Sequence, residues 1–256
     1  MWRPDIVDLS QFYSAAMGQV VRRQLRRELR ATWPDIKGQR LLGLGYATPF
    51  LRPFMGEAER VIAVMPANQG IQRWPRDEPN RVLLADETEL PLADESIDRV
   101  ILVHVLETAE SIRPLLREVW RVLSSDGRAL FVVPNRRGLW SRAEHTPFGH
   151  GHPYTPGQLV RLLKGTMFQP EQVRTCLHLP PLGWRPILRA NHLFERVGPH
   201  LWPRFAGLVM IEAGKQIYAV TPTGERSRRR RIRVAPALAP AARSSECQTS
   251  QPPPRT

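Results

Sequence analysis

Apolar residues near the start of the chain recur at helical spacing and predict a helix from about Gln11 to Trp33. Asp8 or Ser10 can cap this helix, and Pro34 ends it. Its apolar positions include Phe12, Ala16, Val20, Leu25 and Leu29, and arginines fill the other face. We expect an amphipathic helix that packs on a domain and leaves its arginines in water. A helix that binds nucleic acid is the alternative.

Short apolar runs bounded by turn signals follow this helix and predict buried strands. The predicted strands are Arg40–Gly45, Arg60–Val64, Arg81–Ala85, Asp98–Val103, Arg128–Pro134, Gln172–Leu179 and material within Leu208–Val220. Helices are predicted at Thr48–Gly56, at Ser111–Leu123 and after a cap at Thr155. The alternation favours an α/β fold, a Rossmann-like, doubly wound and mainly parallel seven-stranded sheet with helices on both faces. Pro180–Phe205 is interpreted as an insertion over the site or as an irregular connection.

The formal net charge of +13 is uneven along the 256 residues. From Thr221 onward eight arginines face only Glu225 and Glu246, which leaves +6 on this segment. We therefore expect three parts: an N-terminal helix at 1–36, a domain at 37–220 and a disordered basic tail at 221–256. The run Arg228–Arg231 could contact phosphates, but no aromatic residues interleave with it to stack on bases. Nucleic acid is thus a weakly supported partner.

Two cysteines, Cys176 and Cys247, do not suggest a disulfide framework and favour free thiols in a reducing compartment. No stretch reaches about 18 consecutive apolar residues, so no membrane span is expected. The first ten residues lack the apolar core of a signal peptide. These observations predict a cytoplasmic protein.

Three motifs occur in a set order along the predicted strands. The first strand runs into a glycine-containing turn, over the segment Gly43-Leu44-Gly45-Tyr46-Ala47-Thr48-Pro49. The third strand runs into Asp86-Glu87, and Leu90-Pro91-Leu92 and Ser96-Ile97-Asp98 follow. His104-Val105-Leu106-Glu107 comes after the fourth strand. In this order the motifs resemble the class I S-adenosylmethionine-dependent methyltransferases, of the type 11 kind, over Lys37 to Phe168 and more loosely to Val220.

The resemblance implies that S-adenosylmethionine is the cofactor. It assigns Asp86 to the adenine amino group and the Gly43–Ala47 turn to close backbone approach to the methionine and ribose parts. His104 would lie beside the methionine part. The residues implied to bind the cofactor are Gly43, Gly45, Tyr46, Ala47, Met65, Asp86, Glu87 and His104.

The sequence departs from the family at two acidic positions. Gly43 stands where relatives have an acidic residue at the end of the first strand, and Met65 stands where a second one holds the ribose hydroxyls. Met65 could instead pack against the adenine or ribose. Each missing charged hydrogen bond would cost about 1.5–3 kcal/mol. The resemblance makes a methyltransferase the leading hypothesis, with a small molecule as the expected acceptor. The two missing carboxylates motivate the alternative, a weak or inactive methyltransferase-like binding or regulatory protein that associates with polyanions through its basic tail.

Methyl transfer needs a base only where the acceptor must lose a proton, and His104 is the catalytic candidate. A polar contact that closes the pocket is the alternative role for His104. Further candidate bases are Glu107, His145, His150, His152 and Tyr154. The three histidines in 145–152 lack accompanying cysteines or carboxylates at metal-ligand spacing, so no metal is expected. Tyr13 and the pair Met17-Gly18 either cover the cofactor or pack into the core, and Trp120 is expected in the core.

Overall fold

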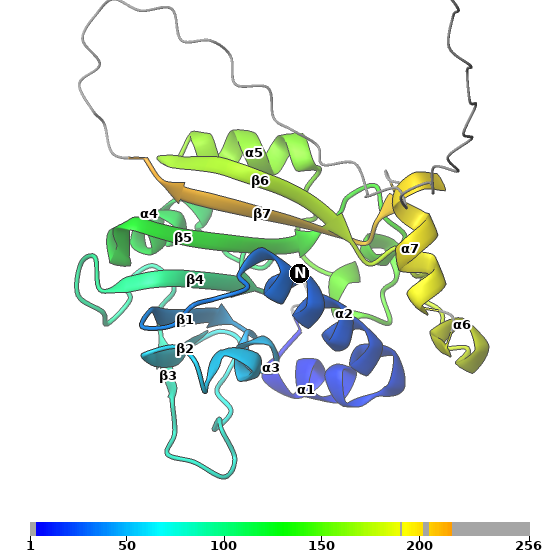
Figure 1. The fold of residues 1–256 in the computed structure, drawn as a ribbon, viewed down its shortest axis with the longest axis horizontal. Coiled ribbons are helices and arrows are strands. Elements are labelled where there is room, and N and C mark those ends of the chain that lie inside the picture. Colours follow the sequence, from blue (N-terminus) through cyan, green and yellow to red (C-terminus); the bar gives the residue numbers. More distant parts are fainter. Residues whose placement is uncertain (1–3, 190, 202–204, 217–256) are drawn as a thin grey trace, which may run out of the picture. The chain divides into compact units, whose positions relative to one another are not determined.

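The computed structural model describes residues 4–189, 191–201 and 205–216, and Figure 1 shows their arrangement. Seven strands form one sheet in the order β3-β2-β1-β4-β5-β7-β6. All neighbouring strands are parallel except β7, which is antiparallel to both β5 and β6. The strands are β1 (Arg40–Gly45), β2 (Arg60–Pro66), β3 (Val82–Ala85), β4 (Ile97–Val103), β5 (Leu123–Pro134), β6 (Phe168–Cys176) and β7 (Leu208–Lys215). The predicted fold class is confirmed.

Seven α-helices and three short 3-10 turns occur in the described part of the chain. The helices are α1 (Ile6–Ser14), α2 (Ala16–Thr32), α3 (Thr48–Leu51), α4 (Ile112–Val122), α5 (Pro156–Lys164), α6 (Arg185–Arg189) and α7 (Asn191–Leu201). The 3-10 turns are η1 (Arg52–Phe54), η2 (Trp140–Arg142) and η3 (Pro147–Gly149). None of the described helices has the length and apolar character to cross a membrane.

Each face of the sheet carries its own hydrophobic core, because successive strand residues point to opposite faces. In β1, Leu41 belongs to the core under α1, α2 and α3, whereas Leu42 and Leu44 belong to the core under α4 and α5. In β5, Leu130 and Phe131 divide in the same way. Both faces are thus buried, as the continuous apolar runs predict.

The predicted N-terminal helix is in fact two helices, which corrects the sequence-based boundary. Asp5, and not Asp8 or Ser10, caps α1 in a capping box that Asp8 completes. Ala15 is extended and separates α1 from α2. Gly18 permits the bend, since a Cβ there would lie 1.9 Å from the carbonyl oxygen of Phe12. The bend folds α1 back across the sheet edge, so that Tyr13 is buried.

Other boundaries also differ from those predicted. The helix after β1 is one turn of α-helix followed by η1 and ends by Phe54, and β5 begins at Leu123 rather than at Arg128. β6 starts four residues earlier than predicted, and the segment 180–205 contains α6 and α7. Trp120 is half-buried rather than in the core, with the Lys215 ammonium 4.1 Å from its ring centroid. The predicted tail at 221–256 lies outside the described residues, and the three part boundaries stay predictions.

An ion pair ties the starts of the central strands together and makes a testable contribution to stability. Both carboxylate oxygens of Asp98 accept hydrogen bonds from the Arg40 side chain, at 2.9 and 3.0 Å, and the Arg40 amide adds a third. These bonds hold the pKa of Asp98 below its usual value, although partial burial opposes them. The charged form of Asp98 therefore stabilises the folded state.

We expect Asp98→Asn to lower the free energy of unfolding by about 1–2 kcal/mol near neutral pH, after screening by solvent. A depressed folded-state pKa gives stability that is present above the unfolded pKa of about 3.9 and lost as the pH falls through the folded value. The difference between wild type and variant should therefore shrink below about pH 4. Urea unfolding across this range measures it, with Asp126→Asn as the exposed control. A difference that persists at the lowest pH would contradict the assignment.

Candidate functional site

The turn after β1 brings the chain against the end of β4. Gly45 has φ +79°, and a Cβ there would lie 2.3 Å from the carbonyl oxygen of Val103. A residue with a side chain cannot take this place without shifting β4. Tyr46 and Ala47, which follow Gly45, are buried. The predicted glycine turn therefore lies at the carboxyl edge of the sheet, where ligands bind in open α/β folds.

His104 follows β4 at this edge and lies in a buried polar chain. Its Nε2 is 2.7 Å from the Tyr13 hydroxyl, and its Nδ1 is 3.1 Å from Glu107 Oε1. All three side chains are at most 4% exposed. His104 has φ 55°, a strained value for a residue with a side chain. Tyr46 stacks on Tyr13 with ring centroids 5.5 Å apart, and Phe148 packs on His104 at 4.8 Å.

The direction of the hydrogen bonds follows from the chemistry of the partners. A carboxylate only accepts, so when His104 is neutral and Glu107 is ionised, Nδ1 carries the proton of the imidazole and donates it to Glu107. The unprotonated Nε2 then accepts from the Tyr13 hydroxyl. Burial, followed by electrostatic repulsion from Tyr46 and Glu107, raises the pKa of Tyr13 well above its usual value. The Tyr13 hydroxyl therefore keeps its proton. In this tautomer His104 Nε2 carries a lone pair, which can accept a proton from a group that occupies the position of the Tyr13 hydroxyl.

Gln69, on the loop after β2, joins the site although no sequence motif marks it. Its side-chain N–H donates to the backbone carbonyl oxygen of His104 at 2.8 Å. The backbone carbonyl oxygen of Gln69 accepts from the backbone amide of Ile6 in α1. The side-chain oxygen of Gln69 is buried without a hydrogen-bond partner, as are Glu107 Oε2 and the Tyr154 hydroxyl. Unpaired buried polar atoms of this kind mark strain or a place for a ligand.

Tyr154 is brought to the same edge by a bridge between Tyr154 and Asn135, which follows β5. Burial and the nearby Glu107 raise the pKa of Tyr154 to about 12. Its hydroxyl is therefore protonated at neutral pH and can donate. Of the further candidate bases, Glu107 and Tyr154 thus lie with His104.

The histidine segment 145–152 does not gather into a cluster. His145 Nε2 lies 3.0 Å from the carbonyl oxygen of Pro181, and His150 Nε2 lies 2.7 Å from that of Glu144. His152 is exposed and contacts the Tyr154 ring edge-on. No three His, Cys, Asp or Glu side chains of the described ranges converge as metal ligands.

The structure gives physical reasons for both missing carboxylates. A Cβ on Gly43 would lie 2.7 Å from Ala47 Cβ and 2.7 Å from Leu51 Cδ1, because α3 packs directly on β1. Met65 is fully buried in the core under α1 and α2. Gly43 thus has no room for a side chain, and Met65 is a core residue in this conformation, where a carboxylate would be cut off from solvent.

Asp86 lies on an exposed turn after β3, where Oδ1 accepts from the amide and the hydroxyl of Thr88 at 2.8 and 2.7 Å. These bonds lower the pKa of Asp86, so it is charged. The adjacent Glu87 is buried. Met65 lies near the end of β2, and Asp86 follows the neighbouring strand β3, since Pro66 of β2 pairs with Ala85 of β3. The adenine end of the predicted site is therefore open and acidic, whereas α1 closes the methionine end through Tyr13.

The residues fit a nucleoside cofactor in part. Asp86 offers an acceptor, and Gln69 and Glu107 hold buried acceptor atoms that lack donors. The Tyr13 side chain fills the space beside His104, so α1 must move for a ligand to reach these atoms. Sequence reasoning considered Tyr13 as a cover and selected His104, but it missed Gln69, since one glutamine in a loop carries no motif.

Residues 42–131 match the model of the methyltransferase domain family. No curated protein matches the chain significantly. Among solved structures, a S-adenosylmethionine-dependent methyltransferase from Thermotoga maritima, described as a possible histamine N-methyltransferase, is 17% identical with a TM-score of 0.57; the alignment covers 81% of this chain and 94% of that one. A methyltransferase from Archaeoglobus fulgidus is 20% identical with a TM-score of 0.57, over 76% and 94% of the two chains.

A third similar structure is the complex of the Haloferax volcanii Trm112 methyltransferase activator with a methyltransferase, at 15% identity and a TM-score of 0.57 over 75% and 89% of the chains. At these identities the likeness shows the fold. The family match covers the segment that holds the glycine turn, Met65, Asp86 and His104. The family match identifies a methyltransferase domain at residues 42–131 of this chain, and the fold around it is that of the S-adenosylmethionine-dependent methyltransferases named above.

Proposed function

We propose that this methyltransferase acts on a small molecule whose acceptor atom must lose a proton, with His104 as the base. The observation that carries the proposal is the buried Tyr13–His104–Glu107 chain beside the glycine turn. It supplies a histidine nitrogen without a proton, oriented by a carboxylate, at the ligand edge of the sheet. A buried location suits a small acceptor, because a macromolecular one would need an exposed target site.

Asp86 is the proposed partner of the adenine, and the Gly43–Ala47 turn and Glu87 are proposed to border the cofactor. Gln69 is the proposed partner of the ribose hydroxyls, because its unpaired side-chain oxygen can accept where Met65 cannot. The bound cofactor supplies an electrophilic methyl group on a sulfonium. The protein's contribution is alignment of the acceptor and removal of its proton.

Movement of α1 is part of this proposal. Tyr13 occupies the hydrogen-bonding direction of His104 Nε2, so an acceptor reaches His104 only after Tyr13 leaves. A reducing compartment such as the cytoplasm suits the protein, since Cys176 is a free buried thiol.

Methyl transfer from tritium-labelled S-adenosylmethionine tests the acceptor class. A cell extract is separated by size into small-molecule and macromolecular fractions, and each is incubated with the full-length protein. We expect enzyme-dependent label in the small-molecule fraction. Label only in the macromolecular fraction would contradict the proposed acceptor. No transfer to either fraction, together with no calorimetric binding of S-adenosylhomocysteine, would favour an inactive methyltransferase-like protein. The absence of carboxylates at Gly43 and Met65 supports that alternative.

The proposed role of Gln69 predicts a loss of cofactor affinity on substitution. We expect Gln69→Leu to weaken binding of S-adenosylhomocysteine by about tenfold, since one hydrogen-bond acceptor is removed from a buried site. Gln69→Glu keeps an acceptor but loses the N–H that donates to the carbonyl oxygen of His104, so we expect it to bind no more tightly than the wild type. Calorimetry measures both, with the exposed Gln11→Leu as the control. Unchanged affinity in Gln69→Leu would show that another group holds the ribose.

A further inference from the structure

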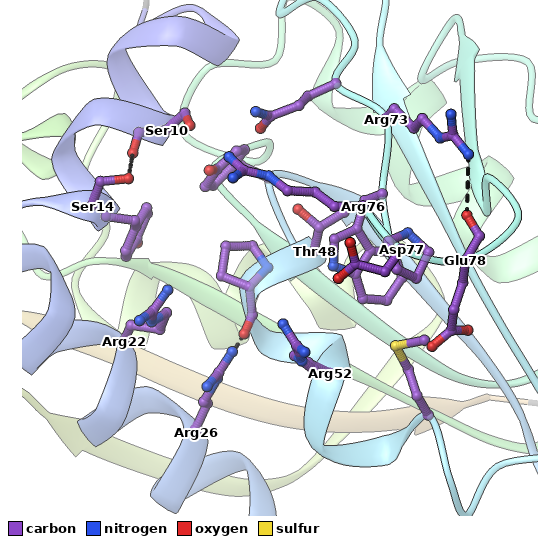
Figure 2. A pocket seen from close by; sticks show the side chains of 17 residues that line it. Ser10, Ser14, Arg22, Arg26, Thr48, Arg52, Arg73, Arg76, Asp77 and Glu78 are labelled. Atoms are coloured by element: carbon purple, nitrogen blue, oxygen red, sulfur yellow. Dashed lines mark hydrogen bonds between the residues drawn. The ribbon is translucent and has the colours of Figure 1, made fainter.

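A cavity of about 370 Å³ lies beside the candidate site, between α1, α2, the α3–η1 turn and the loop 72–78 (Figure 2). Tyr13 and Tyr46 form the wall on the side of His104. Ligand pockets of small molecules have volumes of about 300–1,000 Å³. We call this space the arginine cavity, because its lining includes Arg22, Arg26, Arg52, Arg73 and Arg76.

The arginines greatly outweigh the acidic groups around the cavity. Asp77 and Glu78 are the two carboxylates of the lining, and Glu78 pairs with Arg81 at 3.0 Å. Arg73 turns away toward the carbonyl oxygen of Glu78, as Figure 2 shows. In the described part of the chain no carboxylate forms an ion pair with Arg22, Arg26, Arg52 or Arg76. A local excess of positive charge remains.

Two of these arginines, Arg22 and Arg26, are half-buried. Arg26 donates to the carbonyl oxygen of Pro49 at 2.7 Å, but burial, Arg22 and Arg52 lower its pKa. The Arg22 Nε is buried without a hydrogen-bond partner. The amphipathic pattern of α2 predicts that its arginines lie in water. This prediction is wrong for Arg22 and Arg26. Arg23 and Arg27 lie exposed on another face, whereas Arg22 and Arg26 line the cavity.

The geometry favours a tetrahedral anion over a flat one. Arg22 and Arg26 come from α2, Arg52 from η1 and Arg76 from the loop across the cavity. Guanidinium groups that approach from different directions can each bind a separate oxygen of a phosphate, whereas a carboxylate offers its two oxygens in one plane. Trp74 and Met55 supply an apolar wall for the rest of a ligand.

We propose that the arginine cavity is a binding site for the phosphate group of a small phosphorylated compound. Side chains from four segments of the chain enclose the site, which suits a small molecule better than a nucleic-acid strand. This site is separate from the cofactor contacts assigned to Asp86 and Gln69, and its occupation can be measured without methyl transfer.

Calorimetry with inorganic pyrophosphate at constant ionic strength tests the proposal on the full-length protein. We expect saturable binding that Arg22→Gln and Arg52→Gln each weaken by at least about tenfold, the loss of one charge-assisted hydrogen bond. Arg27→Gln, on the exposed face of α2, should bind as the wild type does. Thermal unfolding without ligand checks that the variants are folded, and we expect no loss of stability because positive charges in close proximity are removed.

Two further probes separate phosphate recognition from general charge attraction. Succinate should bind at least about tenfold more weakly than pyrophosphate. The affinity of the protein for a short duplex DNA should be the same in Arg22→Gln as in the wild type. Absence of pyrophosphate binding, or equal weakening by Arg27→Gln, would overturn the proposal. Equal affinity for succinate would overturn the assignment to phosphate, and loss of DNA binding in Arg22→Gln would show that the cavity belongs to a polyanion surface.

Discussion

Restoring the family's carboxylate in the first strand, as Gly43→Asp, is expected to destabilise the protein strongly instead of improving cofactor binding. The new Cβ would meet Ala47 Cβ and Leu51 Cδ1, each at 2.7 Å, in a strand that is buried between β2 and β4. Overpacking of a core costs about 1–3 kcal/mol, and an unpaired buried carboxylate adds several more. We expect a loss of at least about 4 kcal/mol, measured by urea unfolding.

Gly157→Asp is the matched control for this substitution. Gly157 is exposed in the first turn of α5, and no atom lies within 4 Å of a Cβ placed there. An aspartate at this end of a helix interacts favourably with the helix dipole, so stability should be unchanged or slightly higher. If Gly43→Asp unfolded at the wild-type urea concentration and bound S-adenosylhomocysteine more tightly, α3 would have to shift readily, and the packing account of Gly43 would be wrong.

The sheet could be predicted from the sequence because its signals are local. Runs such as Arg40–Gly45 and Asp98–Val103 are short, apolar and flanked by turns, and both became central strands. The fold therefore followed from pattern and motif order. The absence of a carboxylate at position 43 was also visible, but its cause was not. The structure shows that α3 packs so closely on β1 that a side chain at position 43 does not fit. This distance depends on tertiary packing and has no local sequence signal.

The composition of the site could be predicted only in part. His104 was selected because it follows a strand at the ligand edge, but its partner Tyr13 lies 91 residues away in the chain. That contact depends on the bend at Ala15, and an extended alanine has no sequence signature. Gln69 and the division of the α2 arginines into two faces depend in the same way on how α1 and the loop 72–78 fold back.

Replacement of the histidine beside Tyr13, as His104→Gln, is expected to lower methyl transfer by about 10²–10⁴-fold, the usual contribution of a positioned base. Glutamine can hydrogen-bond to Tyr13, but it cannot take up a proton at neutral pH. Affinity for S-adenosylhomocysteine should stay close to that of the wild type, because Gln69 binds the backbone oxygen of residue 104 and not its side chain. Rates with the labelled small-molecule fraction and calorimetry provide the two measurements.

Glu107→Gln separates the base from the group that orients it. An amide at position 107 no longer requires the proton on Nδ1, so part of the histidine population carries it on Nε2 and cannot act as the base. We expect a smaller loss of rate than in His104→Gln, while the exposed His152→Gln serves as the control. Full activity in His104→Gln with unchanged affinity would mean that the acceptor loses its proton elsewhere or has none to lose. The buried Tyr13–His104–Glu107 chain would then act in closure of the site by α1, since those same hydrogen bonds hold Tyr13 in place.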